Sequence, residues 1–462
     1  MLRRKAYEKL VDWKSEKKRK ALCIIGARQI GKTTIVREFA ASNYDCLAEI
    51  NFITDKGAAD IFAGSLDAET LIVNLTAYLR KPLTPGKTLV FFDEVQNCPN
   101  ARTAIKFLVE DGRFDYIESG AMLGVRHKTV SSYPVGFEEI YRMYPMDFEE
   151  YLWANGVQQS TIDYLKDCFK QKSEVRDAIH NTMKKLFYSY IVVGGMPQVV
   201  QTFVETHDIG RVIENQRDIL EQYRLDISQY AEGSEKIKIR AVFDSIPAQL
   251  NDKNRRFYVN SINKNARLAR YDNCFKWLED AGVALPCYNV TEPRAPLQLN
   301  EKRSLFKLFM NDVGLLCASC FDNIQFELLN GHVDVNMGSI LENAIAQQLR
   351  SGGFQLYYYD SVELGEVDFL IQNGTSVEII EAKSGHDYKK HKALDNVTAV
   401  KGWEFENTYV LCEGNVETDG SVTYLPWYMY IFLKQSPIPK GKIYQIDISA
   451  LHMPESKSSP SI

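Results

Sequence analysis

The sequence lacks several features that would assign it to a class at once. Within its 462 residues, no apolar stretch approaches the roughly 20 residues that span a bilayer, so we expect no membrane helix. The basic N-terminus, Met1–Lys5, is not followed by an apolar segment, which argues against a secretory signal. An excess of positive charge is also lacking, because the net charge of −5 creates no overall field that attracts nucleic acid.

Paired cysteines are lacking too. The nine cysteines are scattered along the chain, which is typical of a protein in the reducing cytoplasm, and we expect a cytoplasmic location. Cys317 and Cys320 have the spacing of a metal or redox pair. No second pair and no histidine cluster accompanies them, so we interpret them as buried thiols.

The residues that are present are typical of a folded, multidomain chain. Hydrophobic residues make up 45% and charged residues 25%, and the length suggests about three domains. Strand and helix patterns alternate over 1–146, become mostly helical over 147–330 and mix again over 331–453, while the tail 454–462 is expected to be disordered. We therefore expect an α/β fold class with a parallel sheet first, a helical middle region and a C-terminal α/β domain.

The most informative segment matches the P-loop pattern G-x-x-x-x-G-K-[ST], and its residues are Gly26, Ala27, Arg28, Gln29, Ile30, Gly31, Lys32 and Thr33. The apolar run Ala21–Ile25 before it predicts a buried strand, and Thr33–Ala40 after it predicts a helix. Such a loop turns its backbone N–H groups toward phosphates, and the helix N-terminus adds positive potential. Lys32 would reach the β- and γ-phosphates, and Thr33 would ligate Mg²⁺.

A second predicted strand, Thr88–Phe92, ends in two acidic residues. Asp93 would hold Mg²⁺, directly or through water, and Glu94 would orient or deprotonate the attacking water. The nearby Gln96 fits a solvated turn residue better than a phosphate ligand. Ser119 follows another strand where a sensor of the γ-phosphate would be useful, although serine there is usually a cap or turn residue. Further strands and helices are expected over Cys46–Phe52, Ala68–Leu79, Ala101–Glu110 and Tyr116–Glu118.

The middle region contains a basic stretch within a pattern that is compatible with a winged helix. The order over Ile239–Val290 is helix, short strand or turn, helix and strand. Asn251–Arg270 sets six cations against the single acid Asp252, and they are Lys253, Arg255, Arg256, Lys264, Arg267 and Arg270. These side chains could contact nucleic-acid phosphates, but a solvated helix face or a surface for protein contacts is the favoured interpretation.

The C-terminal region carries candidate catalytic residues on a predicted hairpin. Asn373-Gly374 is a strong turn signal, and with this turn Asp368 pairs with Ile379. Strand alternation then places Asp368, Glu381 and Lys383 on one face, with the two carboxylates as diagonal neighbours about 7–8 Å apart at the backbone. The carboxylates could share a divalent ion that binds a phosphodiester and activates water, and Lys383 could stabilise the developing charge.

The motifs of the first half resemble those of the predicted prokaryotic AAA+ superfamily ATPases, which pair an N-terminal ATPase with a C-terminal half of unknown function. The matching segments are Gly26–Thr34, which adds Thr34 to the loop, Phe92–Gln96, Ser119–Ala121, Tyr144–Leu152, Gly194–Pro197 and Asn311–Leu315. The resemblance implies an ATPase that uses ATP and Mg²⁺ and contacts the nucleotide through the loop, Thr34 and Ser119.

Two positions depart from the family pattern. Gly136 is followed by Phe137 where many members carry arginine, so no arginine role can be assigned there. Arg126 and Arg142 are substitutes between which the sequence does not choose. Asp147 replaces the serine or threonine of the family signature. Assembly into an AAA+-type ring therefore does not follow, and a homo-oligomer stays an open alternative.

The spacing D-x₁₂-E-x-K resembles the core of PD-(D/E)XK nucleases. Asp368, Glu381 and Lys383 fill it, and Glu342 matches the further acid that an upstream helix supplies in that superfamily. The resemblance implies a nuclease-like fold with metal ligands at Glu342, Asp368 and Glu381. We therefore expect a Mg²⁺-dependent ATPase coupled to a DNA-directed, nuclease-like domain. The alternative is a nucleotide-operated switch or scaffold whose nuclease-like domain only binds partners.

Overall fold

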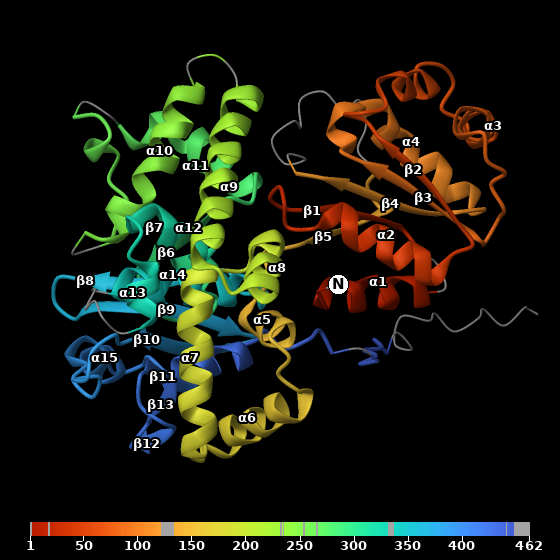
Figure 1. The fold of residues 1–462 in the computed structure, drawn as a ribbon. Helices are drawn as coiled ribbons and strands as arrows, with labels where there is room; N and C mark the ends of the chain where they lie inside the picture. The colour runs from red at the N-terminus through yellow and green to blue at the C-terminus, as the bar shows by residue number, and fades with distance from the viewer. Residues whose placement is uncertain are drawn as a thin grey trace, which may run out of the picture.

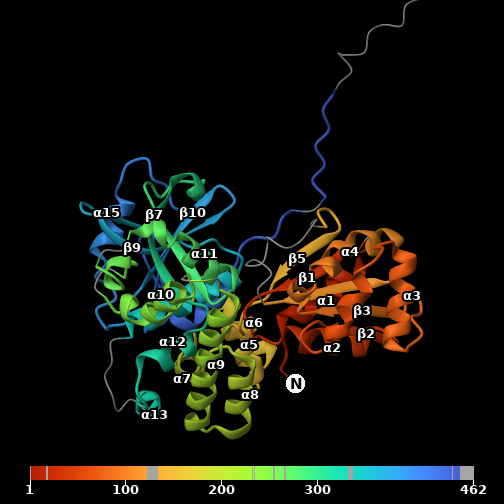
Figure 2. The same ribbon diagram turned by 90° about the horizontal axis from the view of Figure 1, so that it is seen from above.

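The computed structural model contains two sheets at opposite ends of the molecule, with long helices between them (Figure 1). The view from above, in Figure 2, shows the same separation, with α7, α8 and α9 grouped at the lower centre of the picture. The structure describes residues 2–16, 19–121, 134–231, 233, 235–252, 255–264, 267–330, 337–439 and 441–447. Arg126, Lys253 and the predicted disordered tail 454–462 lie outside these residues.

The first sheet is parallel and five-stranded, in the order β2-β3-β4-β1-β5. Its strands are β1 (Ala21–Ile25), β2 (Cys46–Asn51), β3 (Thr88–Asp93), β4 (Asp115–Gly120) and β5 (Glu138–Arg142). Two helices pack on each face: α1 (Lys5–Ser15) and α2 (Lys32–Asn43) on one, α3 (Ala68–Leu79) and α4 (Pro99–Asp111) on the other. The strands and helices expected in this half are confirmed. Their sequence pattern is informative because parallel strands are buried on both faces and are therefore apolar throughout.

The middle region is helical, as its pattern predicts. Its helices are α5 (Phe148–Ala154), α6 (Gln159–Gln171), α7 (Asp177–Val193), α8 (Pro197–Thr206), α9 (Ile209–Tyr230), α10 (Glu235–Leu250) and α11 (Asp272–Asp280). Asp147 caps α5 and forms a capping box with Glu150. The aspartate that replaces the serine or threonine of the family signature therefore does the work of an N-cap residue.

The second sheet is mixed and eight-stranded, in the order β12-β13-β11-β10-β9-β8-β6-β7. Its strands are β6 (Ala284–Val290), β7 (Glu301–Met310), β8 (Tyr357–Ser361), β9 (Gly365–Asn373), β10 (Ser376–Ala382), β11 (Asn407–Cys412), β12 (Glu417–Asp419) and β13 (Val422–Pro426). The helices of this part are α12 (Val313–Cys320), α13 (Gln325–Leu329), α14 (Gly338–Ser351) and α15 (Lys392–Thr398).

The strand expected at the end of a winged-helix-like unit is β6, which belongs to this second sheet instead. β6 and β7 pair with each other, and β6 also pairs with β8. The helix that the pattern places before this strand begins only at Asp272, as α11. The pattern correctly predicts a helix followed by a strand, but a local pattern does not reveal which sheet a strand joins.

The β9–β10 hairpin has a different register from the predicted one. Asn373 pairs with Ser376, so the turn is Gly374-Thr375 and Asp368 comes opposite Glu381 instead of Ile379. Only Gly374 has a positive φ, of 65°, which suits the first position of a type II′ turn. Asn373 stays in the strand, and its side-chain Oδ1 accepts a hydrogen bond from the Ser436 N–H at 3.0 Å. A shift of two residues leaves every side chain on its predicted face.

The segments that match family landmarks meet at one tight junction. The Gly195 N–H donates to Asp312 at 2.6 Å, and a Cβ at Gly195 would lie 1.9 Å from the Met146 carbonyl oxygen. A Cβ at Gly314 would lie 2.5 Å from the carbonyl oxygen of Val193. Only glycine allows backbones to approach this closely. The junction joins the end of the first sheet's region to α8 and to the start of α12.

Candidate functional site

The P-loop connects β1 to α2 in a conformation that requires its glycines. Gly26 has φ 147°, and a Cβ there would lie 2.3 Å from the Met143 carbonyl oxygen. Gly31 caps α2 with φ 90°, and Gln29 between them also has a positive φ, of 64°. The loop therefore ends with the helix N-terminus facing a cavity, as phosphate binding requires.

Lys32 is buried and folds back on its own loop. Its Nζ donates to the carbonyl oxygens of Gly26 at 3.0 Å and Ala27 at 2.7 Å. Burial lowers the pKa of Lys32 to about 8, although Glu94 and Asp93 oppose this shift. An anionic phosphate would replace the two weak carbonyl partners and favour the charged amine.

Asp93 is the centre of a polar cluster at the carboxyl ends of three strands. Its Oδ2 accepts from Thr33 Oγ1 and from Asn51 Nδ2, both at 2.9 Å, and its Oδ1 accepts from the Ser119 hydroxyl. Hydroxyl and carboxylate oxygens are ligands that Mg²⁺ prefers. Thr33 and Asp93 thus fit the predicted Mg²⁺ site, and Ser119 lies beside it. Asn51 was not anticipated, although it lies in a predicted strand of the same sheet, at the end of β2.

Glu94 has the left-handed backbone conformation, with φ 55°, directly after β3. Its Oε2 accepts from Gln96 Nε2 at 2.5 Å. Gln96 is buried, so its interpretation as a solvated turn residue is wrong. A side-chain amide that donates to Glu94 orients the carboxylate in the nucleotide cavity.

A cavity of about 450 Å³ lies over the loop. The loop supplies part of the lining with Arg28, Gln29, Gly31, Lys32, Thr33 and Thr34, and Glu94 lies at the wall. The N-terminal segment contributes Leu2 and Arg4, and the start of α8 contributes Pro197, Gln198 and Gln201. A cavity of this size, with the phosphate-binding loop on one side and a mixed wall that includes Leu2 and Pro197 on the other, fits a nucleoside triphosphate.

The loop is also tied to α9 in the middle region. Arg28 Nη1 lies 2.7 Å from Asp226 Oδ1, and Gln29 donates to Gln222. The hydroxyl of Tyr223 donates to the Arg28 carbonyl oxygen at 3.3 Å. Burial raises the pKa of Asp226 to about 6, while Arg28 lowers it. These contacts between distant parts of the chain carry no sequence signal.

Asp368, Glu381 and Lys383 lie together on one face, as the hairpin pattern predicts. Asp368 and Glu381 are directly opposite each other and therefore closer than the predicted diagonal neighbours. The Asp368 N–H faces Glu381 Oε2 at 3.4 Å, and Asp368 Oδ2 accepts from the Ala382 N–H at 2.8 Å. Lys383 Nζ donates to Glu381 Oε1 at 2.8 Å. Burial, with the nearby charge of Asp368, raises the pKa of Glu381 to about 7.

Glu342 joins this group from α14 and is held by two cations. Lys307 Nζ of β7 lies 3.3 Å from Glu342 Oε2 and 2.5 Å from Glu366 Oε1. Arg255 pairs with Glu342 Oε1, and its Nη1 also lies 3.9 Å from Asp368 Oδ1. We name Glu342, Asp368, Glu381 and Lys383 the C-terminal carboxylate site. The guanidinium of Arg255 lies between two of its carboxylates.

Arg255 and Arg256 are therefore not available to a nucleic acid on an exposed face. Arg256 pairs with Asp360 of β8. Lys264, Arg267 and Arg270 are exposed, but they lie in turns before α11 and not on a recognition helix. Arg142 lines a separate cavity of about 590 Å³ with Glu279 and Arg303, away from the P-loop cavity.

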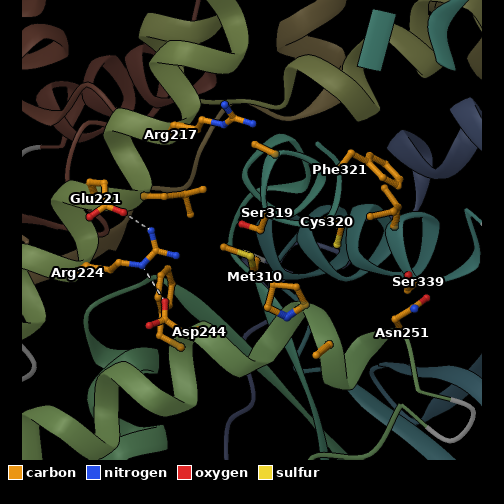
Figure 3. Close-up of a pocket in the computed structure, with 16 residues that line it drawn as sticks. Arg217, Glu221, Arg224, Asp244, Asn251, Met310, Ser319, Cys320, Phe321 and Ser339 are labelled. Atoms are coloured by element: carbon orange, nitrogen blue, oxygen red, sulfur yellow. Dashed lines mark hydrogen bonds and ion pairs between the residues drawn. The ribbon is translucent and has the colours of Figure 1, made fainter. Parts of the chain in front are cut away.

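A larger cavity, of about 940 Å³, lies where α9 and α10 face α12 and α14 (Figure 3). Arg224 of α9 bridges Glu221, at 2.5 Å, and Asp244 of α10, at 2.8 Å. Cys320 lines the cavity and is exposed, whereas Cys317 is buried, so only one of the two predicted buried thiols is buried. No helix in the described part of the chain combines the length and apolar character that crossing a bilayer requires.

Three family models match consecutive parts of the chain. Residues 18–152 match the model described as an AAA domain. Residues 184–324 and 337–430 match two models, each described as a domain of unknown function, DUF8612 and DUF4143. The chain is therefore similar to an AAA domain over its first part and to two domains of unknown function after it. No curated protein matches the sequence.

Solved structures resemble the chain only weakly. The Orc1 protein of Aeropyrum pernix in complex with DNA is 12% identical, with a TM-score of 0.26, over 71% of this chain and 94% of that one. The RuvB Holliday junction branch migration motor of Thermotoga maritima is 12% identical, with a TM-score of 0.29, over 61% and 89%. PCH-2 of C. elegans is 15% identical, with a TM-score of 0.24, over 43% and 57%. Similarity at this level supports no inference about substrate or partner.

Proposed function

We propose that this chain is a Mg²⁺-dependent ATPase whose nucleotide state controls metal-dependent cleavage of DNA at the C-terminal carboxylate site. The observation that carries the proposal is that Asp368, Glu381 and Lys383 contact one another, while Arg255 links Asp368 to Glu342 of α14. Two adjoining carboxylates with a lysine, and a third carboxylate across one guanidinium, are suited to phosphodiester chemistry. The AAA domain supplies the nucleotide-binding half of the proposal.

At the P-loop, each side chain has a role that follows from its position. Lys32 and the N–H groups at the start of α2 would bind the phosphates. Thr33 and Asp93 would hold Mg²⁺, whose charge favours transfer of the γ-phosphoryl group. Glu94, oriented by Gln96, would accept a proton from the attacking water. Ser119, whose hydroxyl donates to Asp93, would act as the sensor of the γ-phosphate.

At the C-terminal carboxylate site, Asp368 and Glu381 would hold a divalent ion together with Glu342. Such an ion, when bound, polarises a phosphodiester and favours ionised water. Lys383 lies 2.8 Å from Glu381, from where it can stabilise charge on the phosphate. In this arrangement the guanidinium of Arg255 occupies part of the space for the ion and neutralises part of the negative charge that would bind it.

The two sites are connected by α9 and α10. Asp226 of α9 holds the P-loop residue Arg28, and Arg224 of the same helix holds Asp244 of α10. The loop after α10 carries Arg255 into the carboxylate site. We propose that nucleotide binding moves α9 and α10 and thereby withdraws Arg255.

A second candidate function is a nucleotide-operated switch without catalysis. It is favoured by one observation: Arg255, Lys307 and Lys383 already pair with the carboxylates, which leaves a nearly neutral cluster suited to a docking surface. The switch would use the same connection through α9 and α10 but would bind a partner instead of cutting DNA.

The test incubates the full-length protein with linear and circular DNA, with Mg²⁺ or Mn²⁺ and with ATP or a non-hydrolysable analogue. Cutting should require metal, and Glu381→Gln should abolish it. Glu378→Gln is the matched control, because Glu378 lies on the same strand, is buried and points to the opposite face. Absence of cutting in every condition would leave the switch as the function.

ATP turnover is measured in parallel. Lys32→Ala should abolish turnover, and it should also remove the effect of ATP on cutting. Asp226→Asn should retain turnover but weaken the effect of ATP on the C-terminal site, since it removes the ion pair between Arg28 and α9. Normal control of cutting in this variant would exclude a connection that depends on this ion pair.

A further inference from the structure

A third group of reactive side chains lies inside the first sheet, on the face that α4 covers. Cys23 of β1 is in register with Glu118 of β4, and Glu138 of β5 is in register with Ala21 of β1. Because side chains two residues apart share a face, all three point toward α4. None of them takes part in the sites described above.

Glu118 is the residue that calls for an explanation. Its side chain is fully buried, and neither carboxylate oxygen has a hydrogen-bond partner among the described residues. Buried polar groups nearly always have hydrogen-bond partners, and burying one without a partner is unfavourable. The Sγ of Cys23 and one carboxylate oxygen from each of Glu118 and Glu138 lie within 4.8 Å of one another.

We propose that Cys23, Glu118 and Glu138 bind one zinc ion. Zinc is bound in proteins by thiolates at about 2.3 Å and by carboxylates at about 2.0–2.2 Å, in tetrahedral geometry. A thiolate ligand favours zinc over Mg²⁺ and Ca²⁺, which prefer oxygen ligands alone. Three protein ligands leave a fourth position for a water molecule.

The neighbouring Arg102 of α4 completes the site. Its Nη2 donates to the two carboxylate oxygens of Glu138, at 2.9 and 3.0 Å. Hydrogen bonds to a ligating carboxylate orient it, as outer partners commonly do at metal sites. Glu138 retains acceptor capacity for an ion because a carboxylate offers about four lone-pair sites.

The charges balance with and without the ion. Burial raises the pKa of the Cys23 thiol and raises that of Glu118 to about 8, although Arg102 opposes both shifts. Without zinc the group is therefore a thiol, a neutral Glu118 and a Glu138–Arg102 ion pair. When zinc binds, Cys23 and Glu118 each release one proton to solvent, so a dication replaces two protons and the net charge stays at zero.

Zinc would reach the site from the edge of the sheet. Glu138 keeps 10% of its side chain exposed. A cavity of about 490 Å³ beside it is lined by Ala21, Tyr116 and Phe137. The bound ion would join β1, β4 and β5 just before Ser119, and would thus brace the strand that positions this residue beside Asp93.

The test is metal analysis of the full-length protein after chelation, reloading with zinc and removal of excess ion. Wild type should retain about one equivalent more than Glu118→Gln, and its thermal midpoint should rise on reloading. Co²⁺ in place of zinc should give a thiolate charge-transfer band that Cys23→Ser removes. Cys98→Ala is the matched control, since Cys98 is a buried cysteine of the same half outside the group.

Glu118→Gln carries the test if Cys23→Ser does not fold, because the amide has nearly the same shape as the carboxyl group. Equal zinc content in wild type and Glu118→Gln would overturn the proposal. So would a Glu118→Gln variant that equals the stability of zinc-loaded wild type, because Glu118 would then be a neutral buried acid whose partner is water.

Discussion

Removal of the Arg255 side chain should open the C-terminal carboxylate site to a divalent ion. In the structure its guanidinium pairs with Glu342 and lies 3.9 Å from Asp368. A metal ion that uses these two carboxylates must compete with the guanidinium. Arg255→Ala removes the competitor and leaves Asp368, Glu381 and Glu342 in place.

The size of the effect follows from the pairing. Two unit charges 4 Å apart attract by about 4 kcal/mol at an effective dielectric constant of 20, before desolvation is subtracted. The Arg255 side chain is 27% exposed, so we take the net value of a charged hydrogen bond, about 1.5–3 kcal/mol. Each 1.4 kcal/mol is about tenfold in affinity, so Arg255→Ala should tighten metal binding by about 10- to 150-fold.

The assay follows free Mn²⁺ by electron paramagnetic resonance in the nucleotide-free, full-length protein. Arg256→Ala is the matched control, because the neighbouring arginine pairs with Asp360 outside the site and should leave the affinity unchanged. Adding Glu381→Ala to Arg255→Ala should remove the gain. Equal Mn²⁺ affinities in wild type and Arg255→Ala, in folded proteins, would refute the competition between guanidinium and metal.

Three further results are expected. Glu94→Gln should retain nucleotide binding but lower ATP turnover about 10²- to 10⁴-fold, the usual contribution of a general base, as separate binding and turnover assays would reveal. Asp147→Ala should lower the free energy of unfolding by at least about 1 kcal/mol in denaturant titrations, whereas Asp147→Ser, which keeps the cap of α5, should retain most of it. Because burial raises the pKa of Glu381 to about 7, its contribution to stability is present at low pH and lost as pH rises through about 7. Mn²⁺ affinity of Arg255→Ala should rise over the same range, and a pH-independent affinity would contradict the role of Glu381.

The parts of the fold that local pattern determines could be predicted from the sequence. The run Ala21–Ile25 is apolar throughout, and Gly26 and Gly31 take conformations that few other residues allow. Residues at strand ends in a parallel sheet come together at one edge, so Asp93 and Ser119 could be placed near the P-loop.

The features that depend on distant contacts could not be predicted. The turn of the β9–β10 hairpin moved by one residue because Asn373 is held by Ser436, which lies 63 residues away in the sequence. The placement of β6 and β7 in the second sheet follows from pairing with β8. In the sequence, Arg255 is one of six basic residues in the stretch Asn251–Arg270. Only the folded chain shows that it pairs with a carboxylate.

The connection between the two sites depends on the geometry of a single helix. α9 has 22 residues and is therefore about 33 Å long, and residues two apart on it point about 200° from each other. Asp226 consequently faces the P-loop while Arg224 faces α10. Tyr223, the residue before Arg224, donates to the Arg28 carbonyl oxygen. A nucleotide that displaces Arg28 must therefore either break its pair with Asp226 or move α9, and movement of α9 pulls on Asp244 of the helix that precedes Arg255.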